Sequence, residues 1–537
     1  MYELNDFAGA YDNFNKVSSM NTSMEEDDLF NYDMGYTQFK LKKYDEAISS
    51  FTAYTKQAVS KKDRVRLNDV YLRIGDANFV TKNYWPGMEA YNKALEMNGF
   101  NADYAAFQKA ISYGFVQRNE RKIEDLEEFI TKFRTSTYRD DVIYELGNTY
   151  INTNQVAKGV RAYDKLIREY PNSSYTSQAM MRKGLQLYNE GKLEASLTVF
   201  KQVAEKYAGT PQAVQAITSA RQVYIDQGRT NDYAIWVRGL DGVEVTDNEL
   251  DDTAYESAEQ PYIQGDMNGT AREMKKYLQQ FPNGKYALKA NFYLAQAQFS
   301  QNKKAESVAH YEYVTSKERS EFTEQALARL SEIHLGTKDY VKAISVLKQL
   351  EQLADFPQNV IYAQSNLMKA YYETEKYGDA VIYANKVLND SSIENNVRSD
   401  AEIIIARSSW KQGNEVASKV GYEKVRQTAT GSLGAEATYY KAYFENKEGK
   451  HDAVITTVNG LSKNYGGYKL WSAKGLVVMA QSYYALNQTL NATTILDAVI
   501  ANFKQYPDVV ATAQGELAKI KTEAAKTNSS VVPTSQN

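Results

Sequence analysis

The sequence predicts an all-α fold, a solenoid of about 12–13 helix–turn–helix repeats. Three observations lead to this prediction. Residues 140–175 show two amphipathic helices followed by a stop, the same pattern recurs about every 37 residues along the 537-residue chain, and only 8 prolines interrupt it. Because each repeat packs only on its neighbours, one long core can run through a chain of this length without separate globular domains.

The clearest unit lies at residues 140–175. Its first apolar face has the spacing i, i+3, i+4 and i+7 of one side of a helix, with Ile143, Leu146, Gly147 and Tyr150. Turn-forming residues 152–154 then break the pattern. The second apolar face holds Val160, Tyr163, Leu166 and Ile167. Pro171 ends this helix because proline has no N–H to donate. We expect helix backbones to approach closely at Gly147 and Gly159.

This pattern resembles the tetratricopeptide repeat, a helix–turn–helix unit of about 34 residues with apolar, Leu-Gly, Tyr, small, aromatic and Pro positions in order. The corresponding residues here are Ile143, Leu146, Gly147, Tyr150, Gly159, Tyr163 and Pro171. The step of 24 residues from Gly147 to Pro171 is also that of the family. The resemblance implies a right-handed solenoid in which the first helix of each unit lines a concave groove.

The position of Gly147 recurs through almost the whole chain. The equivalent residues are Gly35, Gly75, Ala110, Gly147, Gly184, Ala220, Ala258, Ala295, Ser331, Met368, Ala406, Lys441 and Ala480. Twelve residues further on, most units have a small residue, and sixteen residues further on a large packing residue such as Phe51, Tyr163 or Trp236. We expect less regular packing in the units that depart from this pattern at Lys122, Asp232, Ala384, Lys441 and Thr457.

The composition excludes several classes of function. The chain has 63 basic and 67 acidic residues, a formal net charge of −4, so it lacks the basic surface that recruits nucleic acid or anionic lipid. It has no cysteine, which excludes disulfides and thiolate chemistry. Its longest apolar runs, 403–406 and 475–480, fall far short of the roughly 18 residues that span a bilayer. We therefore expect protein or peptide partners, no nucleic acid and no membrane span, and we leave the oligomeric state open.

The repeat pattern divides the chain into two halves. Residues 1–240 form an N-terminal half whose first repeat is incomplete, and residues 253–526 form a C-terminal half that ends in a capping helix. Between them, six of the twelve residues at 241–252 are acidic and no apolar face is present. This segment is predicted to be an acidic linker that could act as a hinge, with a long loop between repeats as the alternative. We expect Pro261 to bend or shorten the next helix and residues 527–537 to be disordered.

The first residues match only the second half of a repeat. Ala10, Phe14 and Val17 occupy second-helix positions, and no first helix precedes them. We therefore expect Met1 to lie inside a longer array. The alternative is that residues 1–20 form a capping helix, which repeat arrays use to cover an exposed apolar face.

Groups that could support catalysis or bind a metal do not converge in the sequence. The histidines, His310, His334 and His451, lie in different repeats, and none has a second histidine at helical spacing. Phosphate-binding glycine loops and zinc motifs are missing. Acidic pairs such as 140–141 stand at helix starts, where they complement the helix dipole. We expect a protein that is not an enzyme, with no catalytic residue, no cofactor and no metal.

The remaining candidate site is a surface of aromatic residues. In the tetratricopeptide family, positions two, five, nine and twelve of each unit face the groove, and position twelve is aromatic in nine of the thirteen units here. Rings with polar neighbours are typical of binding surfaces. The alternative is that these rings only fill space between successive first helices. The residues predicted to bind a partner on the concave face are Tyr36, Phe39, Phe79, Tyr144, Asn148, Tyr188, Tyr262, Phe292, Phe299, Tyr372, Arg407, Trp410 and Tyr484.

The sequence favours a non-catalytic scaffold that binds a protein or peptide partner on its concave face. A self-assembling structural component of the cell envelope is the alternative. The family's carboxylate clamp, with Lys and Asn at positions five and nine, is not expected, since position five holds Tyr32, Leu72 and Phe107 in the first three units. The unit endings at 170–175 and 281–286 resemble those of cell-envelope tetratricopeptide proteins. This resemblance implies a periplasmic or outer-membrane-associated location, with a cytoplasmic one as the alternative.

Overall fold

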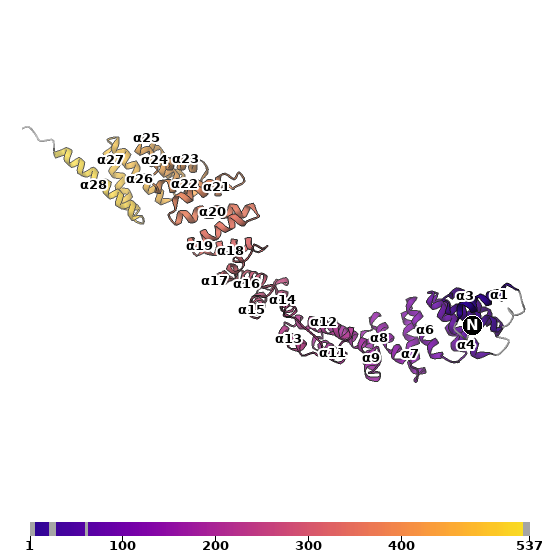
Figure 1. Cartoon of the computed structure of the whole chain (residues 1–537). Coiled ribbons are helices and arrows are strands. Elements are labelled where there is room, and N and C mark those ends of the chain that lie inside the picture. Colours follow the sequence, from indigo (N-terminus) through magenta and orange to yellow (C-terminus); the bar gives the residue numbers. More distant parts are fainter. Residues whose placement is uncertain (1–5, 21–27, 59–62, 530–537) are drawn as a thin grey trace, which may run out of the picture. The chain divides into compact units, whose positions relative to one another are not determined.

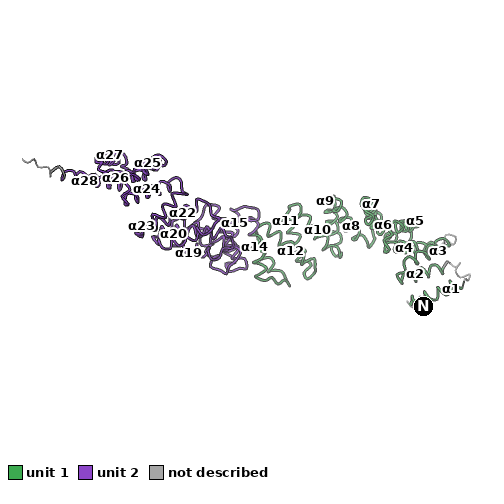
Figure 2. The backbone as a smooth tube through the Cα atoms, turned by 90° about the horizontal axis from the view of Figure 1, so that it is seen from above, with its two compact units in different colours: residues 1–257 green, residues 258–537 purple. Residues whose placement is uncertain are grey.

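The computed structural model describes residues 6–20, 28–58 and 63–529. Within these ranges the chain forms 28 helices and no strand (Figure 1), so the predicted all-α fold is confirmed. Helices α2 to α27 form thirteen consecutive pairs, with α1 before the first pair and α28 after the last. The chain is therefore a solenoid of helix–turn–helix repeats, as the recurring pattern predicts. It divides into two compact units between Ser257 and Ala258 (Figure 2).

The first unit contains α1 to α13 and most of α14, inside which the division falls. Its helices are α1 (Phe7–Ser19), α2 (Asp28–Lys40), α3 (Tyr44–Ala58), α4 (Arg64–Val80), α5 (Tyr84–Glu96), α6 (Ala102–Phe115), α7 (Asn119–Lys132), α8 (Arg139–Asn152), α9 (Val156–Glu169), α10 (Thr176–Asn189), α11 (Leu193–Lys206), α12 (Pro211–Asp226), α13 (Thr230–Arg238) and α14 (Asp247–Ile263).

The second unit contains the end of α14 and all later helices. These are α15 (Met267–Gln280), α16 (Ala287–Ser300), α17 (Lys304–Thr315), α18 (Thr323–Gly336), α19 (Tyr340–Leu353), α20 (Pro357–Glu373), α21 (Tyr377–Leu388), α22 (Asn395–Lys411), α23 (Glu415–Thr428), α24 (Gly431–Lys447), α25 (His451–Tyr465), α26 (Lys469–Ala485), α27 (Thr489–Asn502) and α28 (Pro507–Ser529).

The turn inside every helix pair contains one residue with a positive φ. Glycine or asparagine, the residues that adopt this left-handed conformation most readily, stands at eight of the thirteen turns. The thirteen residues are Lys42, Lys82, Gln117, Asn154, Gly191, Gly228, Gly265, Asn302, Lys338, Glu375, Gly413, Gly449 and Asn487. They mark the repeat register independently of the apolar pattern.

The even-numbered helices, which are the first helices of the repeats, form one layer within each unit. The main contacts that skip a helix all join even-numbered helices, namely α2 with α4 and α10 with α12 in the first unit, and α20 with α22, α24 with α26 and α26 with α28 in the second. Helices that touch across a skipped neighbour are the more closely spaced layer of a curved stack. We call the surface of this layer the inner face.

Each repeat is held together by a large side chain of the second helix that packs on a small residue of the first. A Cβ added to Gly147 would lie only 2.6 Å from a ring carbon of Tyr163, which is fully buried. The same ring-on-glycine contact occurs in Gly35 with Phe51, Gly75 with Tyr91, and Gly184 with Phe200. The predicted close approach of helix backbones holds between Gly147 and Gly159, since a Cβ added to Gly159 would lie 3.0 Å from the carbonyl oxygen of Gly147. The Tyr163 ring fills the space over the Cα of Gly147.

In two of the irregular units the buried positions are displaced by one residue. In the pair α24–α25, Ala442, Val454 and Val458 are fully buried in one cluster, next to the expected positions Lys441 and Thr457. In α13 the buried residues are Tyr233, Ala234 and Val237, and Trp236 is only half-buried, while Ala220 of α12 is buried as expected. The turn residues Gly228 and Gly449 shift by the same single step.

A third irregular unit exchanges the sizes of its two contact residues. Met368 stands where other units have glycine or alanine, and Ala384 stands where they have a ring. Both side chains are fully buried in one cluster. The large side chain has moved from the second helix to the first, and the packing between the helices is kept.

The acidic segment 241–252 is shorter as a loop than the sequence predicts. Helix α14 begins at Asp247, and Leu250 and Asp251 in its first turns are buried. A reciprocal cap starts the helix, since the Thr246 N–H donates to Glu249 Oε2 at 2.7 Å and the Glu249 N–H donates to Thr246 Oγ1 at 3.2 Å. The linker therefore ends at residue 246, and its role as a hinge stays a prediction. Pro261 lies within α14, which continues to Ile263.

The C-terminal capping helix is longer than predicted. Helix α28 runs from Pro507 to Ser529, so residues 527–529, which were assigned to a disordered tail, are helical. Residues 530–537 lie outside the described residues. None of the described helices is both long and apolar enough to cross a membrane.

The ring-on-glycine contact gives a test of local packing. We expect Gly147→Ala to lower the free energy of unfolding by about 1–3 kcal/mol, because the new methyl group collides with the Tyr163 ring. Gly460→Ala is the matched control, since Gly460 lies inside α25 with open space around its Cα. That substitution should instead stabilise the helix by up to about 1 kcal/mol.

Hydrogen exchange followed by mass spectrometry would locate both effects. Protection should fall around α8 and α9 in the Gly147 variant and remain unchanged in the second unit, since repeats contact mainly their neighbours. A uniform loss of protection through both units would show that the contact is not local.

Candidate partner-binding site

The predicted position-twelve rings lie on the first helices and are half-buried. The eight residues in this group are Phe39, Phe79, Tyr188, Tyr262, Phe299, Tyr372, Trp410 and Tyr484. Some pack edge-on against the ring that opens the second helix of the same repeat, as in Phe39 with Tyr44, Phe79 with Tyr84 and Tyr372 with Tyr377. They therefore fill space in the repeat and still present part of each ring to solvent.

Other rings of this group reach the next first helix. The Tyr188 hydroxyl donates to Asp226 at 2.6 Å, and the Tyr484 hydroxyl donates to Glu523 at 2.6 Å. Tyr262 stacks on Tyr293 with ring centroids 3.8 Å apart. These contacts join successive repeats along the inner face.

Trp410 lies in the densest aromatic cluster of the second unit. Its ring meets Tyr440 and Tyr443 at centroid distances of 5.2 Å each, and Phe444 at 6.0 Å. Phe299 has a different environment, with the Arg329 guanidinium and the Lys304 ammonium 4.7 and 4.8 Å from its ring centroid.

Tyr144 and Phe292 are buried in the structure. Only 7% of Tyr144 and 4% of Phe292 is exposed. Tyr144 stacks on Tyr175 at 4.9 Å, and Phe292 stacks on Phe322 at 4.6 Å. Position five thus places a ring beneath a ring of the next repeat, where it serves packing and offers little surface to a partner.

Three further predicted residues use their polar groups within the protein. Asn148 Oδ1 accepts the hydroxyl of Tyr163 at 2.8 Å. The Tyr36 hydroxyl donates to Asp69. The Arg407 guanidinium binds Glu436 through two hydrogen bonds of 2.8 and 2.5 Å. The binding role of the thirteen residues stays a prediction. A partner that bound through them would have to replace the contacts that these side chains make within the protein.

The Arg407–Glu436 pair joins α22 to α24 at the inner face. Glu436 is 2% exposed, and its carboxylate also accepts the Tyr422 hydroxyl at 3.0 Å. Hydrogen bonds to Glu436 raise the pKa of Arg407 above its ordinary value. Burial raises the pKa of Tyr422 above its ordinary value as well. The Arg407 guanidinium therefore remains charged and the Tyr422 hydroxyl protonated over the whole physiological range.

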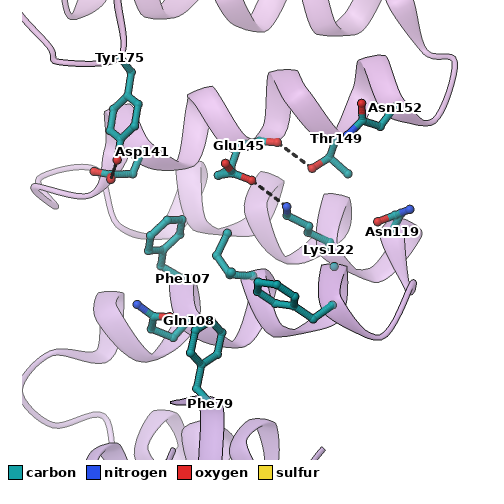
Figure 3. A pocket seen from close by; sticks show the side chains of 13 residues that line it. Phe79, Phe107, Gln108, Asn119, Lys122, Asp141, Glu145, Thr149, Asn152 and Tyr175 are labelled. Atoms are coloured by element: carbon teal, nitrogen blue, oxygen red, sulfur yellow. Dashed lines mark hydrogen bonds and ion pairs between the residues drawn. The ribbon is translucent and has the colours of Figure 1, made fainter. Parts of the chain in front are cut away.

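A cavity of about 550 Å³ opens on the inner face of the first unit (Figure 3). Its lining comes from α4, α6, α7, α8 and the residue before α10. The apolar part is formed by Phe79, Phe107, Ile111 and Phe115, and the polar part by Gln108, Asn119, Lys122, Asp141, Glu145, Thr149, Asn152 and Tyr175. The volume lies within the range of ligand sites, and the lining combines aromatic with polar side chains.

The cavity is lined by one basic and two acidic side chains. Lys122 Nζ pairs with Glu145 Oε2 at 2.8 Å, which leaves Asp141 as a third charge. The Tyr175 hydroxyl donates to Asp141 Oδ1 at 2.8 Å. Burial raises the pKa of Asp141 above its ordinary value. No Lys or Arg in the described part of the chain pairs with this carboxylate, so the cavity has one negative charge in excess.

Only Phe79 of the thirteen predicted residues lines the cavity. The sequence signal that marks this place is a departure from the repeat pattern. Position twelve of this unit is Gly114 where most units have a ring, and the small position holds Lys122. The missing ring leaves the space, and the lysine chain passes along its edge, 3.1 Å from where a Cβ of Gly114 would stand.

A second, smaller cavity of about 330 Å³ lies on the inner face of the second unit, between α24, α26 and α28. Tyr439, Tyr443 and Val477 form its apolar part. The Lys474 ammonium lies 5.7 Å from the Tyr439 ring centroid. In the part of the chain that the structure describes, no group of three His, Asp or Glu side chains is arranged to hold a metal ion.

Two family models of tetratricopeptide repeats match parts of this chain. Residues 239–360 match the tetratricopeptide repeat-like domain and residues 141–173 match the tetratricopeptide repeat. Similar solved structures include "Structure of Naa15/Naa10 bound to HypK-THB", at 13% identity and a TM-score of 0.35, covering 93% of this chain and 79% of that one. Another is "Crystal structure of MamA", at 20% identity and a TM-score of 0.28, covering 32% of this chain and 94% of that one. A search of curated proteins finds no match.

The chain therefore contains tetratricopeptide-like repeats, and the predicted resemblance to that family is confirmed at this level. Repeats of this kind generally serve as scaffolds for protein interaction and are typically not catalytic.

The buried ion pair gives a test of how the inner face is stabilised. We expect Arg407→Met to lower the free energy of unfolding of the second unit by about 2–4 kcal/mol, because Glu436 would remain buried without a cation. Arg407→Met combined with Glu436→Gln should lose much less than the two single substitutions together. Urea denaturation of all four proteins would measure this coupling, and additive losses would show that the pair contributes no interaction of its own.

The half-buried rings can be assigned to packing or to binding by their effect on stability. We expect Trp410→Ala to lower the free energy of unfolding by about 2 kcal/mol, less than the 3–5 kcal/mol of a fully buried tryptophan. Tyr188→Phe is the milder comparison, since it removes only a hydroxyl bonded to Asp226. Thermal melting would measure both, and unchanged melting of the Trp410 variant would mean that the ring is free for a partner.

Proposed function

We propose that the chain is a non-catalytic scaffold that binds a protein or peptide partner on its inner face, with the cavity of the first unit as the principal site. The observation that supports this most is the cavity itself, in which an aromatic floor meets unpaired polar groups. A rigid apolar floor gives contact energy, and a polar rim gives specificity.

Exposed rings beside the cavity extend the same surface. Phe115 is 57% exposed and stacks on Tyr84 with a centroid distance of 4.8 Å and an interplanar angle of 4°. Trp85 is 54% exposed and meets Tyr113 edge-on. Large apolar side chains that gather next to a cavity are the residues that most often contribute binding energy.

Site-specific cross-linking in the cells that express the protein would test the proposal. A photoreactive amino acid replaces Gln108 inside the cavity, or Ile235 on an outer helix of the same unit as the matched control; Ile235 is 76% exposed. We expect one dominant protein adduct from position 108 and none from position 235. Equal labelling at both positions, or no adduct at 108, would contradict the assignment.

The same experiment addresses the alternative function. An adduct between two copies of this chain at position 108 would support a self-assembling component. An adduct with another protein would support the scaffold.

We further propose an envelope location, periplasmic or associated with the outer membrane, which rests on the unit endings at 170–175 and 281–286. Protease digestion of an epitope-tagged chain in intact and in permeabilised cells would test it. A tag that becomes sensitive only after the inner membrane is broken would favour the cytoplasm.

A further inference from the structure

The first-unit cavity contains hydrogen-bonding groups that the protein leaves unused. The side-chain amides of Gln108, Asn119 and Asn152 line it (Figure 3), and none of them makes a hydrogen bond to a residue that the structure describes. Each amide offers two N–H donors and one oxygen acceptor. They stand around the apolar floor on three different helices, α6, α7 and α8.

An extended peptide backbone matches these amides. Every residue of an extended segment presents one N–H donor and one C=O acceptor that are not used within the segment. A helix uses these groups internally, so the backbone of a bound helix would offer the three amides no partners. The amides therefore favour an occupant in extended conformation.

The apolar floor accepts a side chain of the occupant. Phe107 is half-buried, and Tyr138 covers one side of its ring with a centroid distance of 5.9 Å. Ile111 and Phe79 lie on the same floor, and Gly114 adds no side chain to fill it. An aromatic or branched aliphatic side chain fits such a floor because it buries a large apolar area.

The charge of the cavity selects a cation. Lys122 is neutralised by Glu145 at 2.8 Å, so no free ammonium group remains for a carboxylate ligand. Asp141 accepts the Tyr175 hydroxyl but has no cationic partner among the described residues, and the neighbouring Asp140 and Glu145 add to the negative potential around it. A lysine or arginine beside Asp141 would form a charge-assisted hydrogen bond and remove the excess charge.

We propose that this cavity binds an extended peptide segment that packs an aromatic or branched aliphatic side chain against Phe107 and places a lysine or arginine beside Asp141. The proposal rests on the proposed scaffold function and specifies the chemistry of its partner. It differs from recognition of a carboxylate by a cluster of cations, since the one lysine of the cavity is already paired.

A library of linear random peptides displayed on phage, selected on the full chain, would test this. The selected peptides should share an apolar anchor with a lysine or arginine within a few residues of it, and should lack acidic residues there. Fluorescence anisotropy then gives the affinity of one labelled peptide for each variant. We expect Asp141→Asn to weaken binding about tenfold, because a charge-assisted hydrogen bond is lost.

Two controls separate the charge effect from damage to the fold. Asp140→Asn removes the adjacent charge, which does not line the cavity, and should change affinity less than about twofold. The asparagine at 141 can still accept the Tyr175 hydroxyl, and thermal melting verifies that the variants are folded. A peptide with norleucine in place of its lysine should bind the wild type and the Asp141→Asn variant equally, because it lacks the charge that Asp141 is proposed to bind.

The extended conformation of the bound peptide is tested by separate affinity measurements. Gln108→Ala and Asn119→Ala should each weaken the same peptide several-fold, and methylation of one backbone nitrogen of the peptide should remove the effect of one of them. Stronger binding of a peptide locked as a helix would overturn the proposal. Selection of acidic peptides, indifference to Asp141→Asn, or no enrichment at all would overturn it too. If cross-linking from position 108 still captures a protein, the scaffold function stands while this inference fails.

Discussion

The solenoid depends on one contact that is repeated from unit to unit, a large side chain of the second helix seated on a small residue of the first. Tyr163 on Gly147 shows the geometry, with space for a ring and for nothing more. The contact fixes both the distance between the paired helices and their rotation, since a ring that turned away would leave a hole in a closely packed core. Met368 and Ala384 show that the contact can be reversed in direction and still fill the same volume.

The repeat fold could be predicted because small and large residues recur with a fixed period. The prediction failed where the local sequence departs from the average spacing or from the apolar pattern. At Lys441 the average spacing placed the small position one residue early, and only the buried Ala442 together with the turn at Gly449 reveals the true register. The acidic segment resembles a linker in sequence because its first helical turn is charged and shows no apolar face. The reciprocal cap formed by Thr246 and Glu249 nevertheless starts the helix there.

The candidate site was harder to predict than the fold. The regular positions of the repeat predict a binding surface, yet rings such as Tyr144 and Phe292 at these positions are buried by packing between repeats. The cavity opens where the pattern is broken, at Gly114 and Lys122, and a search for consensus residues passes over such places. In a repeat protein, departures from the consensus are therefore as informative about binding sites as matches to it, because the side chains at regular positions pack against neighbouring repeats.

The packing tyrosines connect the core to the inner face. The hydroxyls of Tyr91, Tyr163 and Tyr422 leave the core and bond to Asp76, Asn148 and Glu436, all on first helices. Asn148 is the half-buried acceptor of the three, so a partner that competed for its side chain would loosen the Tyr163 ring beneath it, and a partner that reinforced this side chain would hold the ring in place. A partner bound at this part of the inner face would thus be thermodynamically linked to the stability of the repeat below it, and the rigidity of that repeat would change with what lies on its surface.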